Sequence, residues 1–478
     1  MTTQTVTPYL NSRAAQWRTT PGRASAHELH RSMTGYAPTA LRELPALAAE
    51  LGVGRVFVKD ESDRLGLPAF KILGASWAVC RTVAQRIGLP AENITVESLR
   101  DGLRAAGSPQ LTIVTATDGN HGRAVARMAA LLGLRARVYI PGGVGDTAVR
   151  AIEAEGAPVV FGGPSYDDAV ATAARSAAGP DELLVQDTSW PGYEEVPRWI
   201  VEGYMTLFAE ADEQLAAAGA HGPDLVACPV GVGALAHAMV DHYRGVARST
   251  AALLTVEPRT ADCVAQSLRA GEPVTVDTSA PTMMAGLNCG TPSGIGWPTI
   301  RDGVSAAVSV TEDECRRAVG DLQGLGQDSG PCGAASLAGV RELLGAPGAR
   351  DELGLDKDSV VLLISTEAST CSPSSCRGCA HGTSVGGWTR TSAAPGPPRC
   401  SRRRPAGAGS ASSWRTSSAR SRRAGWACSN GSPAAPTSSS GACALPADAP
   451  PPTPSASSRS SSGPSASCSG SSSPSPRS

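Results

Sequence analysis

The 478-residue chain contains no run of about 18 apolar residues, the length that a membrane-spanning helix requires. Its first residues also lack the apolar core of a secretory signal. We therefore expect a soluble, cytoplasmic protein without a membrane partner.

Paired cysteines at the spacing of a metal site are also missing. Six of the thirteen cysteines lie before residue 370 as isolated thiols, which is typical of a reducing compartment. The other seven follow it, and Cys376-Arg377-Gly378-Cys379 is a single CxxC motif with no second pair at zinc-site spacing. We therefore predict no metal site.

Residues 371–478 contain no Lys, Glu, Ile, Phe, Tyr, Met or Gln, and only one Leu and one Val. Because such a segment cannot bury a core, we predict a disordered, low-complexity tail rich in Ser, Pro and Arg. A shifted reading frame in a GC-rich gene yields this composition, and the boundary falls inside an apparent domain motif. We favour that origin over a genuine interaction tail, although runs such as Arg402-Arg403-Arg404 also occur in nucleic-acid-binding arms.

Negative charge is concentrated before that tail. The tail holds twelve Arg against one acidic residue, Asp448, whereas the whole chain has a formal net charge of −1. Residues 1–370 are therefore strongly acidic, which argues against a nucleic-acid partner for the part that folds.

In residues 53–367, short β-branched segments alternate with longer, alanine-rich segments of helical period. This alternation over about 300 residues predicts an α/β fold with parallel sheets. We expect strands at 55–59, 111–115, 136–140, 158–161, 183–186, 225–229, 253–256, 306–310 and 359–364. We expect helices at 72–87, 121–132, 148–155, 166–177, 196–217 and 234–242, and one after a capping box at Thr311. The first 35 residues show neither pattern and are expected to be irregular.

Lys71 stands between Phe70 and Ile72, ahead of the small residues Gly74 and Ala75. Most lysines are solvated surface charges, and this residue taken alone fits that description as well. A lysine that apolar neighbours desolvate has a lowered pKa and becomes a nucleophile towards aldehydes.

Two glycine-containing turns each follow a predicted strand and precede a predicted helix. Asp118-Gly119-Asn120-His121-Gly122 would bring polar side chains against a ligand, although Asp and Asn are also ordinary helix caps. Gly231, Val232, Gly233 and Ala234 would offer the free N–H groups of a helix N-terminus, which bind phosphate. This second turn lacks the features of both the Walker and the Rossmann loop.

Asp187 follows a further predicted strand, in a segment that resembles an ordinary loop. A carboxylate there could hold a substrate ammonium group, and Asp118 could do the same or act as a general base. Together with Lys71 and the two turns, these residues suit pyridoxal phosphate (PLP). This cofactor needs an amine for its aldehyde, a donor for its phenolate oxygen and N–H groups for its phosphate.

The order of these motifs resembles the fold type II PLP-dependent enzymes, and among them the diaminopropionate ammonia-lyase branch. The resemblance covers residues 30–370, and Asp-Gly-Asn at 118–120 is specific because many relatives have Ser-Gly-Asn. Further marks are Gly35-Tyr36-Ala37-Pro38-Thr39, Val58-Lys59-Asp60-Glu61-Ser62, Ala69-Phe70-Lys71-Ile72-Leu73-Gly74, Asp187-Thr188-Ser189-Trp190, Val256-Glu257-Pro258 and Met284-Ala285-Gly286-Leu287-Asn288-Cys289-Gly290.

This resemblance implies β-elimination of ammonia from 2,3-diaminopropionate, giving pyruvate and ammonia. Lys71 would bind the cofactor and act as a base at Cα, Asp118 would be the base for the opposite enantiomer, and Asp187 would seat the distal amine. Asn120 would hydrogen-bond the phenolate oxygen, and Thr366 would meet the pyridine nitrogen. The second glycine turn would hold the phosphate.

The resemblance also implies two three-layer αβα domains with twisted, parallel-rich sheets. Residues 1–80 and 190–370 would form the larger, PLP-binding domain, and residues 81–189 the smaller one. A homodimer that acts on a small amino acid is expected from the resemblance alone. Cys263 and Cys289 stand in matching motifs, where a disulfide is possible but two separate buried thiols fit a cytoplasmic protein better.

Two departures from the family pattern leave alternatives open. Ala368 replaces a glycine and the tail replaces a final helix, although every expected cofactor contact precedes that point. Asp63 and Leu65 stand where aromatic residues are usual, which affects substrate fit. The main alternative is a serine or threonine dehydratase of the same fold. The alternative outside enzymes is an inactive frameshifted remnant, or a body used for interaction through its basic tail.

Overall fold

The strands form two separate sheets. The computed structural model describes residues 7–20, 25–245 and 249–369. Its strands are β1 (Tyr9–Leu10), β2 (Leu41–Glu43), β3 (Arg55–Asp60), β4 (Thr112–Ala116), β5 (Arg135–Pro141), β6 (Val159–Gly163), β7 (Glu182–Leu184), β8 (Leu225–Pro229), β9 (Ala252–Pro258), β10 (Ala306–Val310) and β11 (Val360–Ser365). A seven-stranded sheet has the order β1-β10-β9-β8-β11-β3-β2, and a four-stranded sheet has the order β6-β5-β4-β7.

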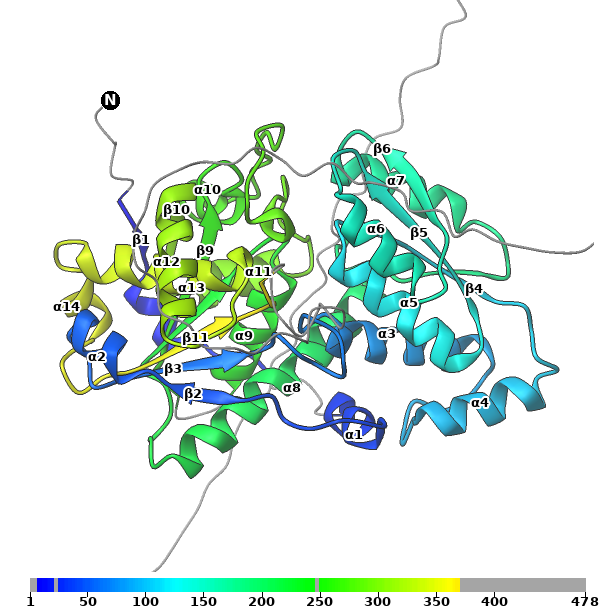
Figure 1. The fold of residues 1–478 in the computed structure, drawn as a ribbon, viewed down its shortest axis with the longest axis horizontal. Coiled ribbons are helices and arrows are strands. Elements are labelled where there is room, and N and C mark those ends of the chain that lie inside the picture. The colour runs from blue at the N-terminus through cyan, green and yellow to red at the C-terminus, as the bar shows by residue number, and fades with distance from the viewer. Residues whose placement is uncertain (1–6, 21–24, 246–248, 370–478) are drawn as a thin grey trace, which may run out of the picture. The chain divides into compact units, whose positions relative to one another are not determined.

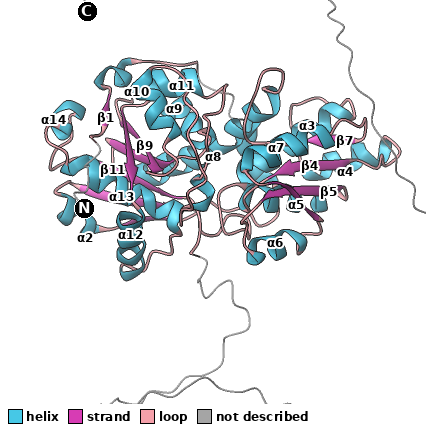
Figure 2. Cartoon of the chain, turned by 90° about the horizontal axis from the view of Figure 1, so that it is seen from above, coloured by secondary structure: helices cyan, strands magenta, loops and turns pink. Residues whose placement is uncertain are grey.

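Helices lie on both faces of each sheet (Figures 1 and 2). They are α1 (Ser25–Ser32), α2 (Pro45–Leu51), α3 (Ile72–Arg86), α4 (Val96–Ala105), α5 (Asn120–Leu132), α6 (Asp146–Glu153), α7 (Tyr166–Ser176), α8 (Glu195–Ala217), α9 (Ala234–Gly245), α10 (Cys263–Ala270), α11 (Trp297–Gly303), α12 (Glu312–Gly324), α13 (Pro331–Gly345) and α14 (Ala349–Leu353). Short 3₁₀ helices span Ser12–Gln16 and Ala285–Leu287.

Each sheet buries both of its faces, because alternate residues of a strand point to opposite sides. In β11, Val361 and Leu363 join one core cluster with residues of α2, α12 and α13, while Leu362 and Ile364 join another with α3, α8 and α9. Side chains of β4 also belong to two clusters: Val114 packs with residues of α7, and Ile113 belongs to the cluster that contains α5. The expected α/β fold with αβα layers is confirmed.

Most strand pairs are parallel, so the carboxyl ends of neighbouring strands meet at one edge of each sheet. Strand β11 pairs in parallel with β3 and β8, and β8 pairs in parallel with β9. In the smaller sheet β4 pairs in parallel with β5 and β7. Only β1 and β2, at the two edges of the larger sheet, pair antiparallel with their neighbours. Ligands of such sheets bind beyond the carboxyl ends.

All nine expected strands are present, two with the expected bounds and the others with ends that differ by at most two residues. The antiparallel edge strands β1 and β2 were not anticipated, because they are two and three residues long and carry no alternating pattern. The expectation of an irregular N-terminus was wrong in part, since β1, a 3₁₀ helix and α1 fall within it. The predicted disordered tail at 371–478 lies outside the described residues.

The four strands of the smaller sheet all lie between residues 112 and 184. The proposed domain boundary at residue 80 falls inside α3, and the division into domains stays a prediction. In the described part of the chain no helix is long and apolar enough to cross a bilayer. The same residues contain no group of three or more His, Cys, Asp or Glu placed to hold a metal ion.

The central position of β11 makes its buried side chains important for stability. Leu363 is 1% exposed, and replacing it by Ala should lower the free energy of unfolding by about 2–5 kcal/mol, since a cavity remains in a packed core. The control is Leu325→Ala, at a site that is 38% exposed, where a change of about 0.5 kcal/mol is expected. Urea unfolding followed by circular dichroism measures both, and equal losses would contradict the prediction.

Candidate active site

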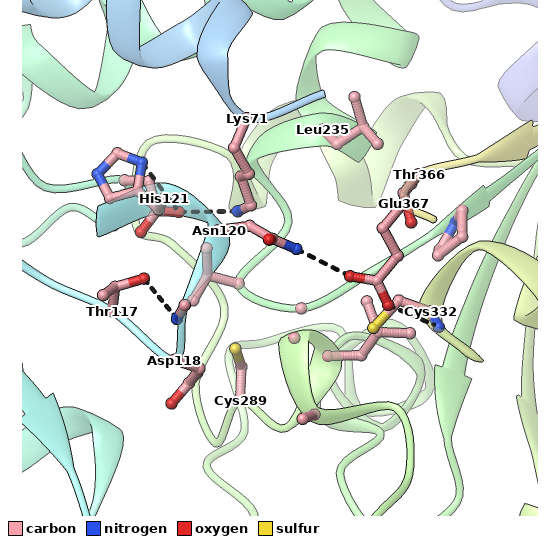
Figure 3. Close-up of a pocket in the computed structure, with 18 of the residues that line it drawn as sticks. Lys71, Thr117, Asp118, Asn120, His121, Leu235, Cys289, Cys332, Thr366 and Glu367 are labelled. Atoms are coloured by element: carbon pink, nitrogen blue, oxygen red, sulfur yellow. Dashed lines mark hydrogen bonds and ion pairs between the residues drawn. The ribbon is translucent and has the colours of Figure 1, made fainter. Parts of the chain in front are cut away.

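A cavity of about 470 Å³ lies beyond the carboxyl ends of strands from both sheets. Strand β4 leads into Asp118 and Asn120, β8 leads into the second glycine turn, and β11 leads into Thr366. Lys71 and Asp187 complete the set, so every residue predicted for the site lines this one cavity. Figure 3 labels Lys71, Asp118, Asn120 and Thr366 among them. Residues that lie up to 295 positions apart in the chain therefore meet in one cavity.

Lys71 forms an ion pair with Asp187. The Lys71 Nζ atom donates to Asp187 Oδ2 at 2.9 Å, and 24% of the lysine side chain is exposed. Burial is the largest influence and lowers the pKa of Lys71, but nearby groups, foremost the Asp187 carboxylate, raise it well above its usual value. The expected lowering of this pKa was therefore wrong, because the paired carboxylate outweighs desolvation.

Asp187 is held by several polar groups. Burial would raise its pKa, but the charge of Lys71 brings it well below its ordinary value, so the carboxylate is ionised. Its Oδ1 atom accepts a hydrogen bond from the Tyr166 hydroxyl at 2.9 Å, and that hydroxyl accepts one from Gln186 Nε2 at 2.8 Å. His121 donates through Nε2 to the Val185 carbonyl at 3.1 Å, which leaves its Nδ1 atom 3.9 Å from Asp187 Oδ2.

Asp118 differs from Asp187 in having no side-chain partner within the described residues. It is partly buried in the wall of the cavity. Burial, reinforced by the negative charge of Asp187, raises the pKa of Asp118 to about 7. The two aspartates of the cavity therefore have separated pKa values, and Asp118 titrates near neutral pH, as a general base does.

Asn120 is the first residue of α5. The turn before it is shaped by Thr117, whose Oγ1 accepts from the backbone N–H groups of Gly119 at 2.9 Å and Gly122 at 3.0 Å. The Asn120 side chain donates through Nδ2 to Glu367 Oε2 at 2.9 Å (Figure 3). One face of this amide is thus engaged by the protein, and the residue also lines the cavity.

The second glycine turn joins β8 to α9. The N–H groups of Gly231, Val232 and Gly233 and of Ala234, the first helical residue, have no acceptor within the described part of the chain. Gly233 has φ +98°, and a Cβ atom there would lie 2.8 Å from Ile300 Cδ1. Free N–H groups at the start of a 12-residue helix form a site for phosphate.

Thr366 supplies a second unsatisfied group. Its side chain is 4% exposed, and its Oγ1 atom has no hydrogen-bond partner among the described residues. A buried hydroxyl without a partner is costly unless a ligand completes it. Because Thr366 lines the cavity, it can serve a polar atom of a bound molecule.

Two cysteines also line the cavity, Cys289 and Cys332, and burial raises the pKa of both thiols. Cys263 and Cys289 are both free and buried, which confirms the preferred reading of separate thiols. Cys263 does not line the cavity.

Three groups at the site were not predicted from the sequence. Tyr166 was read only as the start of a helix, and His121 only as part of a turn. Glu367 had the clearest signal, because it is a charged residue two positions after the end of a buried strand and next to Thr366.

Residues 33–366 match the protein family described as pyridoxal-phosphate dependent enzyme. The chain is 38% identical over 355 residues to the diaminopropionate ammonia-lyase of Salmonella typhimurium, covering 71% of this chain and 87% of that protein. The holo structure of diaminopropionate ammonia-lyase from Escherichia coli matches with a TM-score of 0.68 and 33% identity, over 76% of this chain and 94% of that one. Its complex with D-serine matches with a TM-score of 0.68 and 33% identity, over 77% and 96%.

Replacing Asp187 by Asn removes the charge that raises the pKa of Lys71 and keeps the size of the side chain. Burial then dominates, so we expect the pKa of Lys71 to fall below its wild-type value. Acylation needs the neutral amine, and Lys71 in the ligand-free variant should therefore be acylated at lower pH. Mass spectrometry after labelling over a pH series measures this. Asp181→Asn, at an exposed pair with Arg86, is the control. An unshifted profile in Asp187→Asn would contradict the prediction.

Proposed function

This chain belongs to the family of pyridoxal-phosphate dependent enzymes, and we propose that it eliminates the β-amino group of 2,3-diaminopropionate as ammonia. Water then hydrolyses the released aminoacrylate to pyruvate and a second ammonia. The observation that carries the proposal is a single cavity lined by the Lys71 amine, by the carboxylates of Asp118 and Asp187, and by a turn whose N–H groups have no acceptor among the described residues. The similar proteins of Salmonella typhimurium and Escherichia coli are diaminopropionate ammonia-lyases.

The cavity fits pyridoxal phosphate at several independent points. Lys71 would hold the aldehyde carbon, Asn120 would donate to the phenolate oxygen, and Thr366 would bond the pyridine nitrogen through its unpartnered hydroxyl. The N–H groups of residues 231–234 would hold the phosphate. When bound, this cofactor withdraws electrons from the substrate and so makes its Cα proton acidic.

The remaining steps fall to the side chains of this chain. Lys71 Nζ, once free of the cofactor, would take the Cα proton on one face and can return a proton to the departing β-amine. Asp118 would take the Cα proton on the other face, which corresponds to the opposite enantiomer. Asp187 loses its partner when Lys71 moves, and its ionised carboxylate would then seat an ammonium group of the substrate.

A hydroxyl substrate is the second candidate, because the Escherichia coli ammonia-lyase has been solved with D-serine. The carboxylates of Asp118 and Asp187 favour the diamine, since serine and threonine have no second amine for them to bind. A homodimer and a cytoplasmic location are further proposals, supported by the resemblance to the family.

The primary test is the near-visible absorbance of the full chain with pyridoxal phosphate, before and after addition of 2,3-diaminopropionate. A cofactor band that changes with substrate, together with release of pyruvate, is expected. Lys71→Ala should lose both, whereas the control Lys357→Ala, an exposed lysine, should keep both. Faster turnover of serine or threonine would assign a dehydratase, and a wild-type chain without a band would overturn the proposal.

The pH dependence tests the role of Asp118. As a base it must be deprotonated, and its pKa is raised to about 7, so kcat/KM for the isomer that it deprotonates should rise as pH increases through about 7. Asp118→Asn should lower kcat for one of the two isomers by about 10²- to 10⁴-fold and spare the other, for which Lys71 is the base. Equal losses for both isomers would refute a face-specific role.

A further inference from the structure

Glu367 lines the same cavity, and none of the steps above uses it. It follows Thr366 directly after β11 and is partly buried. Burial raises the pKa of this carboxyl group, although its hydrogen bonds with Cys332 and Asn120 act in the opposite direction. Burial of a carboxylate has a desolvation cost, so the position of Glu367 in the cavity indicates that it has a role there.

Each oxygen of Glu367 has its own donor. Oε2 accepts from Asn120 Nδ2 at 2.9 Å, and Oε1 accepts from the backbone N–H of Cys332, in the first turn of α13, at 3.3 Å. The backbone of Glu367 is fixed as well, since its carbonyl accepts from Gly330 N at 2.9 Å. Figure 3 shows the carboxylate between Asn120 and Cys332. The carboxylate therefore joins α5 beside the smaller sheet to α13 beside the larger one.

A carboxylate can only accept hydrogen bonds, whereas the amide of Asn120 presents two N–H donors on one side and an oxygen on the other. Contact with Glu367 therefore selects the orientation in which Nδ2 faces the carboxylate. The second N–H of Asn120 has no acceptor among the described residues and is available to a ligand. The flipped amide would place its oxygen against the carboxylate, and the hydrogen bond from Nδ2 to Glu367 would be lost.

We propose that Glu367 is a positioning residue that fixes the amide orientation of Asn120, so that Asn120 donates a hydrogen bond to the phenolate oxygen of pyridoxal phosphate. This inference rests on the proposed cofactor site and adds a residue to it. Glu367 itself acts only through Asn120, and the two side chains form one unit.

A double-mutant cycle tests this coupling in the full chain. The variants are Glu367→Ala, Asn120→Ala and the double variant, and the readout is the dissociation constant of pyridoxal phosphate from absorbance titration without substrate. Loss of one hydrogen bond should weaken binding by about tenfold in Glu367→Ala. The double variant should bind no more weakly than Asn120→Ala, and Glu367→Ala should also shift the absorbance maximum of the bound cofactor in the same direction as Asn120→Ala.

Additive losses in the double variant, or wild-type affinity in Glu367→Ala, would overturn the proposal. Thermal unfolding of the cofactor-free variants separates a loss of packing from a loss of positioning, and Glu342→Ala on α13 is the control for removal of a glutamate. If Glu367→Ala does not fold, Glu367→Gln replaces it in the cycle, because Gln keeps the volume but has a single acceptor oxygen. If the wild-type chain binds no cofactor, the proposed function is overturned as well. The wild-type titration therefore distinguishes failure of the proposed function from failure of the role proposed for Glu367.

Discussion

The parallel pairing of β11 is the constraint on which the larger sheet depends. β11 lies between β8 and β3 and pairs with β3 from Val360–Arg55 to Ser365–Asp60. Without it, the hairpin-like pair of β2 and β3 would have no hydrogen-bonded connection to the four strands on the other side. The same strand ends at Thr366 and Glu367, so the pairing that closes the sheet also delivers two side chains to the cavity.

A group of buried charges fixes the approach of the chain to Lys71. Lys59, Glu61, Arg64 and Glu210 all have side chains with 0% exposure, and Arg64 bonds both Glu61 at 2.6 Å and Glu210 at 2.7 Å. Two of the four lie in the loop between β3 and Lys71, while Glu210 belongs to α8. Because each charge has a partner, the loop is anchored; removal of one charge would leave another uncompensated. Lys71, the N-cap residue of α3, therefore follows an anchored loop.

Features that depend on local chemistry could be predicted from the sequence. Strands rich in β-branched residues, the Thr311 capping box and the polar turns after strands were all located, and parallel topology then implied that the turns share one edge. The pKa of Lys71 was predicted with the wrong sign because its partner Asp187 is 116 residues away. Glu367 was overlooked as an active participant because its contact with Asn120 spans 247 residues. Such pairings follow from the tertiary arrangement and leave no mark in the neighbouring sequence.

The position of β11 also determines the order in which the molecule can be assembled on the ribosome. The smaller sheet is complete once Leu184 has been synthesised. Strand β3, in contrast, pairs with β11, which is translated about 300 residues later. At about 5–20 residues per second, this delay amounts to tens of seconds. During that interval one edge of β3, with its apolar side chains Val56, Phe57 and Val58, has no parallel partner. Unpaired strand edges are templates for pairing with other chains, so this edge of β3 is open to wrong pairing until β11 is in place.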